Sequence, residues 1–339
     1  MKLLLVGGGT GGHILPFVSL VNEAQKQGLK IELVLADATL DRAIYEENFS
    51  VPAYFLRTDK IRRYLDIKNF LAPFKILKAV FQAQTILKKS KPNAIFFKGG
   101  FVCFPLLIAT IWHNIWQKKK IKIYSHESDI SVGVLSKLYA KYADFVFESF
   151  GKKTSFPLFF SAQSQPFSWQ TKQKKLLVFG GSQGAQFLNE FVQRNQKILT
   201  DYFEICLVTG RGKSIQSKHK NIHQFELLPA EKLKGALETA DVVLSRAGAN
   251  SLFEILSNQK KSVIVPLPSA ARNHQFLNAQ YFAQKGLIEL YEQADTRNLT
   301  DLLVNTTQNK SLEEMLKTAN IANAAPQIIK IILKSISAR

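Results

Sequence analysis

A loop rich in glycine stands near the start of the chain and carries residue types suited to ligand chemistry. Gly7-Gly8-Gly9-Thr10-Gly11-Gly12-His13 follows the apolar run from Lys2 to Val6, and apolar residues return at helical spacing from Ile14 to Leu20. Such a strand, loop and helix lets the backbone approach a ligand closely, and the N-terminus of the helix favours negative charge. His13 stands at the junction, where its side chain would face the same crevice. The pattern predicts either an anion site or a plain tight turn with an incidental histidine.

Polar residues follow two further predicted strands. Ser125-His126-Glu127-Ser128-Asp129 comes after the strand 121–124, and Arg272-Asn273-His274-Gln275 comes after the strand 262–266. Open α/β sheets bind ligands outside the carboxyl ends of their strands, which is where both groups fall.

A third group of polar residues opens a helix after the turn Arg246-Ala247-Gly248. Ser251 and Glu254 have the spacing of a capping box, which would only stabilise the helix start. The carboxylate of Glu254 could equally accept hydrogen bonds from ribose hydroxyls beside a bound diphosphate.

Alternating apolar runs and helical spacing supply the elements that must position these residues. They predict strands at 2–6, 31–35, 94–97, 121–124, 145–147, 175–179, 204–208, 241–244 and 262–266. A second glycine loop, from Gly180 to Ala185, repeats the opening pattern after the strand 175–179. The segment 151–175 lacks clear periodicity and is expected to contain an interdomain linker. The sequence therefore predicts an α/β fold with two βα-type domains.

The composition favours anionic partners. Lys and Arg number 45 against 26 Asp and Glu, which gives a formal net charge of +19. Such a charge suits nucleic acid, phosphorylated ligands or an acidic membrane surface. Cys103 and Cys206 are expected to be buried thiols in a reducing cytosol rather than disulfide partners. No signal peptide is expected, and the apolar stretch 101–116 is too short and too interrupted to span a membrane.

The stretch from Lys60 to Lys91 interleaves lysine and arginine with apolar and aromatic residues. Within it, Pro73 could open a helix that places Phe74, Leu77 and Phe81 on one face. The stretch is either an amphipathic helix packed on a sheet with solvated lysines or an interfacial membrane patch. The same patch would include Trp112, Trp116 and the lysines at 118–120.

A dinucleotide-binding oxidoreductase is an alternative for the first half of the chain. Gly7, Gly9 and Gly12 satisfy the loose Gly-x-Gly-x-x-Gly pattern, and Asp37 follows the second strand at the distance of a ribose-binding acid.

The motifs taken in order resemble the membrane-associated N-acetylglucosaminyltransferases of peptidoglycan synthesis. The likeness rests on the loop Gly8–His13 and on a more specific second set: Gly180-Gly181-Ser182-Gln183-Gly184-Ala185, Arg246-x-Gly248-Ala249 with Glu254, and His274-Gln275 with Asn278-Ala279. A dehydrogenase has no reason to carry that second set. The resemblance implies a GT-B glycosyltransferase, an α/β fold of two Rossmann-like domains that face each other across a cleft. It also implies inverting transfer of N-acetylglucosamine from UDP-N-acetylglucosamine to undecaprenyl-diphospho-N-acetylmuramoyl-pentapeptide.

The resemblance also implies roles for individual residues. His13 becomes the candidate general base, with Glu127 and Asp129 as rivals, and an imidazole pKa near neutrality suits that task. The residues implied to bind substrate are Thr10, Gly11, Gly12, Asp129, Gly181, Ser182, Gln183, Glu226, Arg246, Gly248, Ala249, Asn250, Ser251, Glu254, His274 and Gln275. No cofactor and no metal are expected, since the sequence has no Asp-x-Asp motif to hold a metal on the diphosphate.

Three positions depart from the family pattern. The usual His-Glu-Gln-Asn is His126-Glu127-Ser128-Asp129, which replaces an amide by a carboxylate. The usual Gly-Gly-Tyr is Gly99-Gly100-Phe101, which loses a hydroxyl. The family's Gly-Asn-Pro-x-Arg is not recognisable, and Ser168 stands where the arginine would be.

The domain boundaries that follow are 1–155 for an acceptor domain facing the membrane, 156–174 for a linker and 175–325 for a UDP-sugar domain. A helix over 326–339 is expected to return to the first domain. The expected partners are UDP-N-acetylglucosamine, the undecaprenyl-linked acceptor and the anionic cytoplasmic face of the cell membrane, with peripheral attachment and no nucleic acid. A related lipid glycosyltransferase and a UDP-N-acetylglucosamine 2-epimerase remain alternatives.

Overall fold

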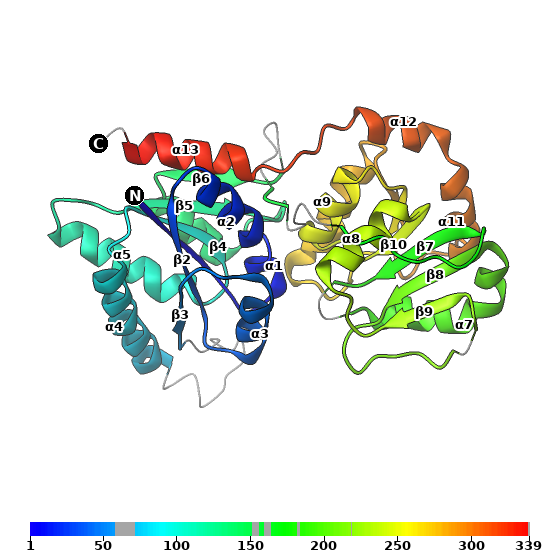
Figure 1. Cartoon of the computed structure of the whole chain (residues 1–339), viewed down its shortest axis with the longest axis horizontal. Helices are drawn as coiled ribbons and strands as arrows, with labels where there is room; N and C mark the ends of the chain where they lie inside the picture. Colours follow the sequence, from blue (N-terminus) through cyan, green and yellow to red (C-terminus); the bar gives the residue numbers. More distant parts are fainter. Residues whose placement is uncertain (58–71, 151–155, 159–163, 182–183, 218, 338–339) are drawn as a thin grey trace. The chain divides into compact units, whose positions relative to one another are not determined.

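The computed structural model describes residues 1–57, 72–150, 156–158, 164–181, 184–217 and 219–337. The chain divides into two compact units, Met1–Phe159 together with Asn323–Arg339, and Phe160–Ala322. Figure 1 shows that each unit contains its own sheet covered by helices.

The first unit is built on a parallel six-stranded sheet with the order β3-β2-β1-β4-β5-β6. Its strands are β1 (Lys2–Gly7), β2 (Lys30–Ala36), β3 (Ala53–Leu56), β4 (Ala94–Gly99), β5 (Lys122–Glu127) and β6 (Phe145–Glu148). Its helices are α1 (Gly11–Ile14), α2 (Phe17–Lys26), α3 (Thr39–Asn48), α4 (Ala72–Ser90), α5 (Cys103–Trp116), α6 (Val134–Tyr142) and α13 (Ala325–Ser337). The strand order reverses between β1 and β4, and such a switch point is the usual ligand position of a doubly wound sheet.

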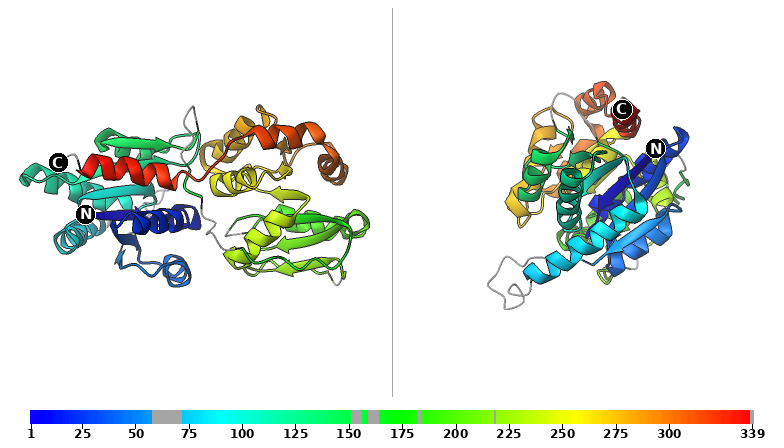
Figure 2. Two further views of the ribbon diagram at one scale, coloured as in Figure 1. Left: turned by 45° about the horizontal axis from the view of Figure 1, so that its top comes forward. Right: turned by 90° about the vertical axis from the view of Figure 1, so that its left-hand side faces the viewer.

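Apolar side chains cover both faces of this sheet. Leu3, Leu5 and Phe17 belong to the core on one face, while Leu4 and Val6 belong to the core on the other. Burial on both faces explains why β1 reads as a continuous apolar run rather than as an alternating one. The helix α13, red in Figure 2, returns after the whole second unit and packs against α2.

The second unit repeats the plan with the parallel order β12-β11-β10-β7-β8-β9. Its strands are β7 (Lys174–Phe179), β8 (Phe203–Val208), β9 (Ile222–Phe225), β10 (Val242–Ser245), β11 (Ser262–Ile264) and β12 (Glu289–Leu290). Its helices are α7 (Gln186–Tyr202), α8 (Ala230–Thr239), α9 (Ala249–Ser257), α10 (His274–Ala283), α11 (Leu299–Gln308) and α12 (Lys310–Thr318). The switch point lies between β7 and β10, so the second glycine loop occupies the same place in its sheet as the first.

Two parallel Rossmann-like sheets confirm the predicted α/β fold class. One local expectation was wrong, because β5 does not end at Tyr124 but continues through His126 to Glu127. Ser125 and His126 are buried within the strand, so their polarity does not mark its end.

Candidate active site

The first glycine loop is packed against the end of the neighbouring strand β4. The amide of Gly8 donates to the carbonyl of Gly99 at 3.3 Å. A Cβ on Gly100 would lie 2.1 Å from the carbonyl oxygen of Gly8, and Gly100 has a φ of +93°. A side chain at Gly100 is therefore excluded both by space and by backbone conformation. This contact brings the carboxyl ends of β1 and β4 together at the switch point of the first sheet.

A buried carboxylate that the sequence analysis did not single out holds the loop from behind. Asp41 on α3 is fully buried, and both of its oxygens accept from the amide of Gly9 at 3.0 Å. Its Oδ2 also accepts from the amide of Ala36 at 3.0 Å. Asp41 thus joins the loop to the end of β2. Its position in an amphipathic helix gave no sequence signal of this role.

His13 lies at the open end of the loop with a fixed tautomer. Its Nδ1 is 3.0 Å from the carbonyl oxygen of Gly8 and 3.3 Å from Oγ1 of Thr10. A carbonyl can only accept, so Nδ1 carries the proton and Nε2 keeps its lone pair. Burial lowers the pKa of His13 and outweighs the opposing effect of the bond to Gly8, and Lys98 lowers this pKa further. The imidazole is therefore neutral at pH 7 and can accept a proton at Nε2.

Because Gly99 has no side chain, it leaves room for Nε2 of His13. A Cβ on Gly99 would lie 3.0 Å from Nε2 of His13, and the φ of Gly99 is +123°. The remaining predicted residues of the loop support the same geometry: Thr10 precedes the short helix α1, and Gly11 and Gly12 form its first turn.

The segment His126–Asp129 belongs to the same end of the first sheet. Oε1 of Glu127 accepts from the amides of Ser128 at 3.1 Å and Asp129 at 3.4 Å. Burial raises the pKa of Glu127 in spite of these bonds and of a hydrogen bond from Ser136. Asp129 acts electrostatically on His13 and raises its pKa. The structure therefore brings the candidate base and both rival carboxylates into one unit.

The geometry around Asp37 does not favour the oxidoreductase alternative. Its Oδ1 accepts from Nη2 of Arg42 at 2.7 Å, and its Oδ2 accepts from Nε of Arg57 at 3.1 Å. These bonds lower the pKa of Asp37. Two guanidinium groups therefore already bond to the carboxylate oxygens that would have to accept hydrogen bonds from the ribose hydroxyls of a dinucleotide.

The second glycine loop is also packed tightly, but against a different strand. A Cβ on Gly184 would lie 2.0 Å from the carbonyl oxygen of Thr209, which follows β8, and the φ of Gly184 is +67°. The amide of Gly184 closes a turn on the carbonyl of Gly181 at 3.0 Å. Ser182 and Gln183, both predicted to bind substrate, lie outside the described residues.

The start of α9 differs from the capping-box alternative. Gly248 is the N-cap residue, so the N-cap position has no side chain to cap this helix. Ser251 therefore lies inside the helix, and the capping-box interpretation was wrong. Ala249 and Asn250 form the first turn, while Ser251 and Glu254 are buried. The first amides of an uncapped helix are suited to bind an anion.

Arg246 is buried and is bound to the protein itself. Its Nη1 donates to the carbonyls of Val265 at 3.1 Å and Pro266 at 3.0 Å. The amide oxygen of Gln293, in the orientation that satisfies both groups, accepts from Nη1 at 3.0 Å and Nη2 at 2.7 Å. Arg246 thus holds the backbone that follows β11, and its predicted contact with substrate remains a prediction.

The other predicted donor residues also bond to nearby loops. Oε1 of Glu226 accepts from the amide of Gly212 at 3.1 Å, and Oε1 of Gln275 accepts from the amide of Leu267 at 3.0 Å. Nδ1 of His274 donates to the carbonyl of Ala271 at 2.7 Å, which leaves Nε2 as an acceptor. Two left-handed residues, Arg272 and Asn273, turn the chain into α10. Such strained turns are common at binding sites.

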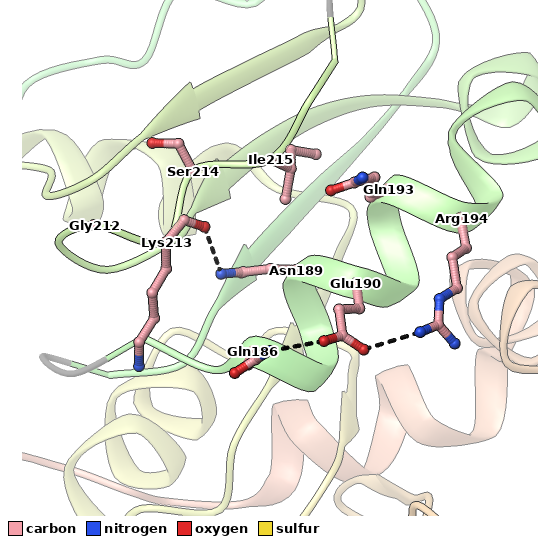
Figure 3. A pocket seen from close by; sticks show the side chains of 9 residues that line it. All are labelled: Gln186, Asn189, Glu190, Gln193, Arg194, Gly212, Lys213, Ser214 and Ile215. Carbon is pink, nitrogen blue, oxygen red and sulfur yellow. Dashed lines mark hydrogen bonds and ion pairs between the residues drawn. The ribbon is translucent and has the colours of Figure 1, made fainter.

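A cavity of about 480 Å³ lies between α7 and the segment 212–215 (Figure 3). Its lining side chains bond to one another: Gln186 and Arg194 donate to Glu190 at 2.8 Å and 3.2 Å. Asn189 donates to the carbonyl of Lys213 at 3.1 Å. The cavity contains none of the predicted site residues.

Across the described ranges, no group of three or more His, Cys, Asp or Glu side chains could hold a metal ion.

Two family models match this chain, one over each of the two sheets. The glycosyltransferase family 28 N-terminal domain matches residues 3–148, and the glycosyltransferase family 28 C-terminal domain matches residues 175–332. The fold and these matches define the class: a glycosyltransferase of family 28 with the GT-B fold.

More specific relatives match the full length. The UDP-N-acetylglucosamine–N-acetylmuramyl-(pentapeptide) pyrophosphoryl-undecaprenol N-acetylglucosamine transferase of Clostridium perfringens is 33% identical over 362 residues, which cover 98% of this chain and 98% of the relative. The chain belongs to the family of these transferases, the MurG family. The crystal structure of Acinetobacter baumannii MurG is similar with a TM-score of 0.75 and 25% identity, covering 98% of this chain and 99% of that one. A UDP-N-acetylglucosamine 2-epimerase has a TM-score of 0.70 at 14% identity, covering 100% of this chain and 97% of that one, and this likeness shows the fold alone.

Proposed function

We propose that this enzyme transfers N-acetylglucosamine from UDP-N-acetylglucosamine to undecaprenyl-diphospho-N-acetylmuramoyl-pentapeptide. The observation that carries the proposal is the full-length match to a relative that is named for this reaction. The neutral imidazole of His13, with its lone pair at Nε2, supplies the base that such a transfer requires.

The proposed step is a direct displacement that inverts the anomeric carbon. The acceptor hydroxyl attacks C1 of the sugar and loses its proton to Nε2 of His13. A new bond forms between C1 and the acceptor oxygen, while the bond between C1 and the diphosphate oxygen breaks. UDP leaves with the bonding electron pair, and its new negative charge must be stabilised.

The second unit is proposed to stabilise this leaving group. Gly248 begins α9 without a side-chain cap among the described residues, and Ala185 begins α7 in the same way. The N-terminal amides of both helices can bind the diphosphate, because the helix dipole adds positive potential there. Gly181, Ser182 and Gln183 precede α7, and Asn250, Ser251 and Glu254 belong to the first turns of α9. Glu226, His274 and Gln275 are proposed to hold the uracil and the sugar.

A transfer assay with radiolabelled UDP-N-acetylglucosamine and a lipid-linked acceptor tests the proposed function. The expected result is label in the lipid product together with one UDP released per sugar. Release of UDP without lipid product, or formation of a 2-epimer without any acceptor, would instead support the epimerase alternative. A matched acceptor with a diacylglycerol lipid separates the proposed enzyme from related lipid glycosyltransferases.

We also propose that the first unit binds the anionic cytoplasmic surface of the cell membrane. The helices α4 and α5 pack together, and six large apolar side chains remain exposed on them: Phe74, Leu77, Phe81, Trp112, Ile115 and Trp116. We call this set the α4–α5 apolar face. The exposed fractions reach 70% for Phe74 and 75% for Trp116. Rings of Phe81 and Trp112 meet edge to face with centroids 6.3 Å apart, which joins the two helices into one surface.

The charge around this face fits an anionic membrane. Lys75 and Lys78 lie on α4, and Lys118, Lys119 and Lys120 follow α5, all of them exposed. Apolar side chains next to lysines bind the interface of an anionic bilayer by burial and by attraction together. The inward side of α4 carries Val80, Ala83 and Ile86, so the Phe74 side of the helix is the one that does not pack on the sheet. The part of the predicted patch at 60–71 lies outside the described residues.

Within the described chain, every helix is too short or too polar to cross a membrane.

Binding to vesicles with and without anionic lipid tests the proposed membrane surface. Replacing Ile115 and Trp116 by serine should weaken binding to anionic vesicles more than tenfold while leaving UDP affinity unchanged. The control is Ile198→Ser on α7 in the other unit, where the isoleucine side chain is also exposed, by 54% against 70% for Ile115. Unchanged vesicle binding by the double variant would remove the assignment.

A further inference from the structure

Lys98 is a buried cation that the proposed reaction does not yet use. It lies in β4 directly before Gly99, and only 3% of its surface is exposed. An ammonium group is costly to bury unless polar partners replace water. Lys98 has such partners: Nζ donates to Nδ1 of His126 at 3.1 Å and to Oγ of Ser128. The ring of Phe156 lies 5.0 Å from Nζ and adds a cation–π contact.

These bonds decide the tautomer of His126. Because the ammonium can only donate, Nδ1 of His126 must accept, and the ring proton is on Nε2. Nε2 lies 3.4 Å from Oγ of Ser149, which in turn donates to the carbonyl of Glu127 at 2.9 Å. Lys98 therefore begins a chain of hydrogen bonds that holds the end of β5.

The charges around Lys98 also connect it with His13. The titratable groups that face it are His126, Glu127 and Asp129 from β5 and the segment after it, and His13 from α1. Burial lowers the pKa of Lys98 to about 8, although the carboxylates of Asp129 and Glu127 raise it. At pH 7 the group is mostly charged. This positive charge disfavours protonation of His13, whereas Asp129 favours it.

We propose that Lys98 is a positioning residue of the first unit, which fixes the segment His126–Asp129 and adds to burial in keeping the imidazole of His13 in its neutral, proton-accepting form. The inference rests on the proposed function only in so far as His13 is the base. The hydrogen bonds and the charge of Lys98 do not depend on that role.

Nuclear magnetic resonance of the histidine side-chain nitrogens in the full chain tests the proposal without an activity assay. In Lys98→Met the cation is gone, so the titration midpoint of His13 should rise by about half a pH unit to one unit. The Nε2–H tautomer of His126 should no longer dominate. Lys137→Met is the control, because Lys137 is exposed on α6, and it should change neither histidine.

Lys98→Gln separates the hydrogen bond from the charge and also serves if the methionine variant does not fold. Its amide can still donate to Nδ1 of His126, so the His126 tautomer should persist while the midpoint of His13 rises as in Lys98→Met. A His13 midpoint within about 0.2 pH units of the wild type in the folded variants would overturn the proposal.

Kinetics then distinguish this inference from the proposed function. If His13 is the base, the acid limb of kcat/KM in Lys98→Gln moves to higher pH by the same amount as the midpoint. A shifted midpoint with an unmoved acid limb would leave Lys98 as assigned but would remove His13 as the base.

Discussion

The two glycine loops of this protein follow the same sequence pattern but differ in what binds their backbone. In the first loop, the carboxylate of Asp41 accepts from the amide of Gly9, and the carbonyl of Gly8 accepts from His13. In the second, Gly184 packs on the carbonyl oxygen of Thr209, and the N-cap residues of α7 and α9, Ala185 and Gly248, have no polar side chain that could cap these helices.

The two loops are therefore suited to different chemistry, although the two sheets have the same plan. A loop whose amide already binds a carboxylate is poorly suited to an anion there, but it can hold a histidine in a fixed tautomer. Uncapped helix N-termini at the other switch point are suited to the charge of a diphosphate. The shared Gly-Gly-x-x-Gly pattern, residues 8–12 and 180–184, therefore predicts a close backbone approach, whereas the neighbouring side chains decide the ligand.

Removing His13 should give the largest effect. His13→Ala is expected to lower kcat by about 10²–10⁴-fold, the usual contribution of a positioned base, while UDP affinity stays unchanged. In the wild-type enzyme burial lowers the pKa of His13, so activity should persist below pH 6.5 and fall only when this group is protonated at lower pH. Steady-state kinetics across pH 5–8 measure both.

Glu127→Gln and Asp129→Asn are the controls for this prediction. If His13→Ala turns over normally and one of these variants does not, the base is that carboxylate. A lower melting temperature with normal turnover in His13→Ala would mean that the histidine only supports the loop.

Disturbing the support of the first loop should have the next largest effect. Asp41→Asn places an amide NH₂ against backbone donors and should lower the free energy of unfolding by about 1–3 kcal/mol. Turnover should fall as well, because the loop carries His13. Asp201→Asn, an exposed position on α7, is the matched control and should stay within about 0.5 kcal/mol of the wild type. Chemical denaturation of the two variants measures the difference, and equal midpoints would contradict the role of Asp41.

A side-chain cap on the N-terminus of α9 should change the affinity for UDP more than the melting temperature. A Cβ on Gly248 meets no atom within 4 Å, so Gly248→Ser has room to cap α9. The melting temperature should stay the same or rise slightly, while the Kd for UDP should increase about tenfold because the hydroxyl competes for the same amides. Gly133→Ser changes the N-cap of α6 in the first unit and should leave UDP affinity unchanged. Calorimetry measures both variants, and an unchanged Kd in Gly248→Ser would show that the diphosphate binds elsewhere.

Chelation should have the smallest effect. The proposed donor site uses helix amides rather than a metal ion, so UDP affinity in EDTA should stay within about twofold of its value with Mg²⁺. Complete loss of UDP binding on chelation would mean that the diphosphate binds through a divalent ion.

The fold class followed from the sequence because buried parallel strands are nearly continuous apolar runs. Three strands were not identified. The first, β3 (Ala53–Leu56), is a short edge strand of which only Leu56 is buried. The other two also lack a buried apolar run: β9 (Ile222–Phe225) is half-buried and contains His223 and Gln224, and β12 is only Glu289–Leu290. Their positions depend on pairing with β8 and β11, which no local pattern records.

The site was less predictable than the fold for a physical reason. Motif residues such as His13 and Gly248 could be named from spacing, but the groups that hold them come from distant positions. Asp41 resembles a surface residue of an amphipathic helix until the loop folds onto it. Lys98 did leave a signal, since a lysine between Phe97 and Gly99 interrupts an apolar strand. Its meaning required the structure, because the groups that bond to it come from elsewhere: His126 from β5 and Ser128 from the segment after β5.

The returning helix α13 has a consequence for the order in which the chain is made. Ile328, Ile329 and Ile332 share a buried core with Leu3 and Phe17, yet all of the second unit is translated between them. Domains usually fold in the order of their synthesis. Here the second unit carries all of its own core by Ala322, while the unit translated first still lacks a helix until α13 is made. A released chain that ends before Ala325 should therefore have a protease-resistant second unit attached to a protease-sensitive first one.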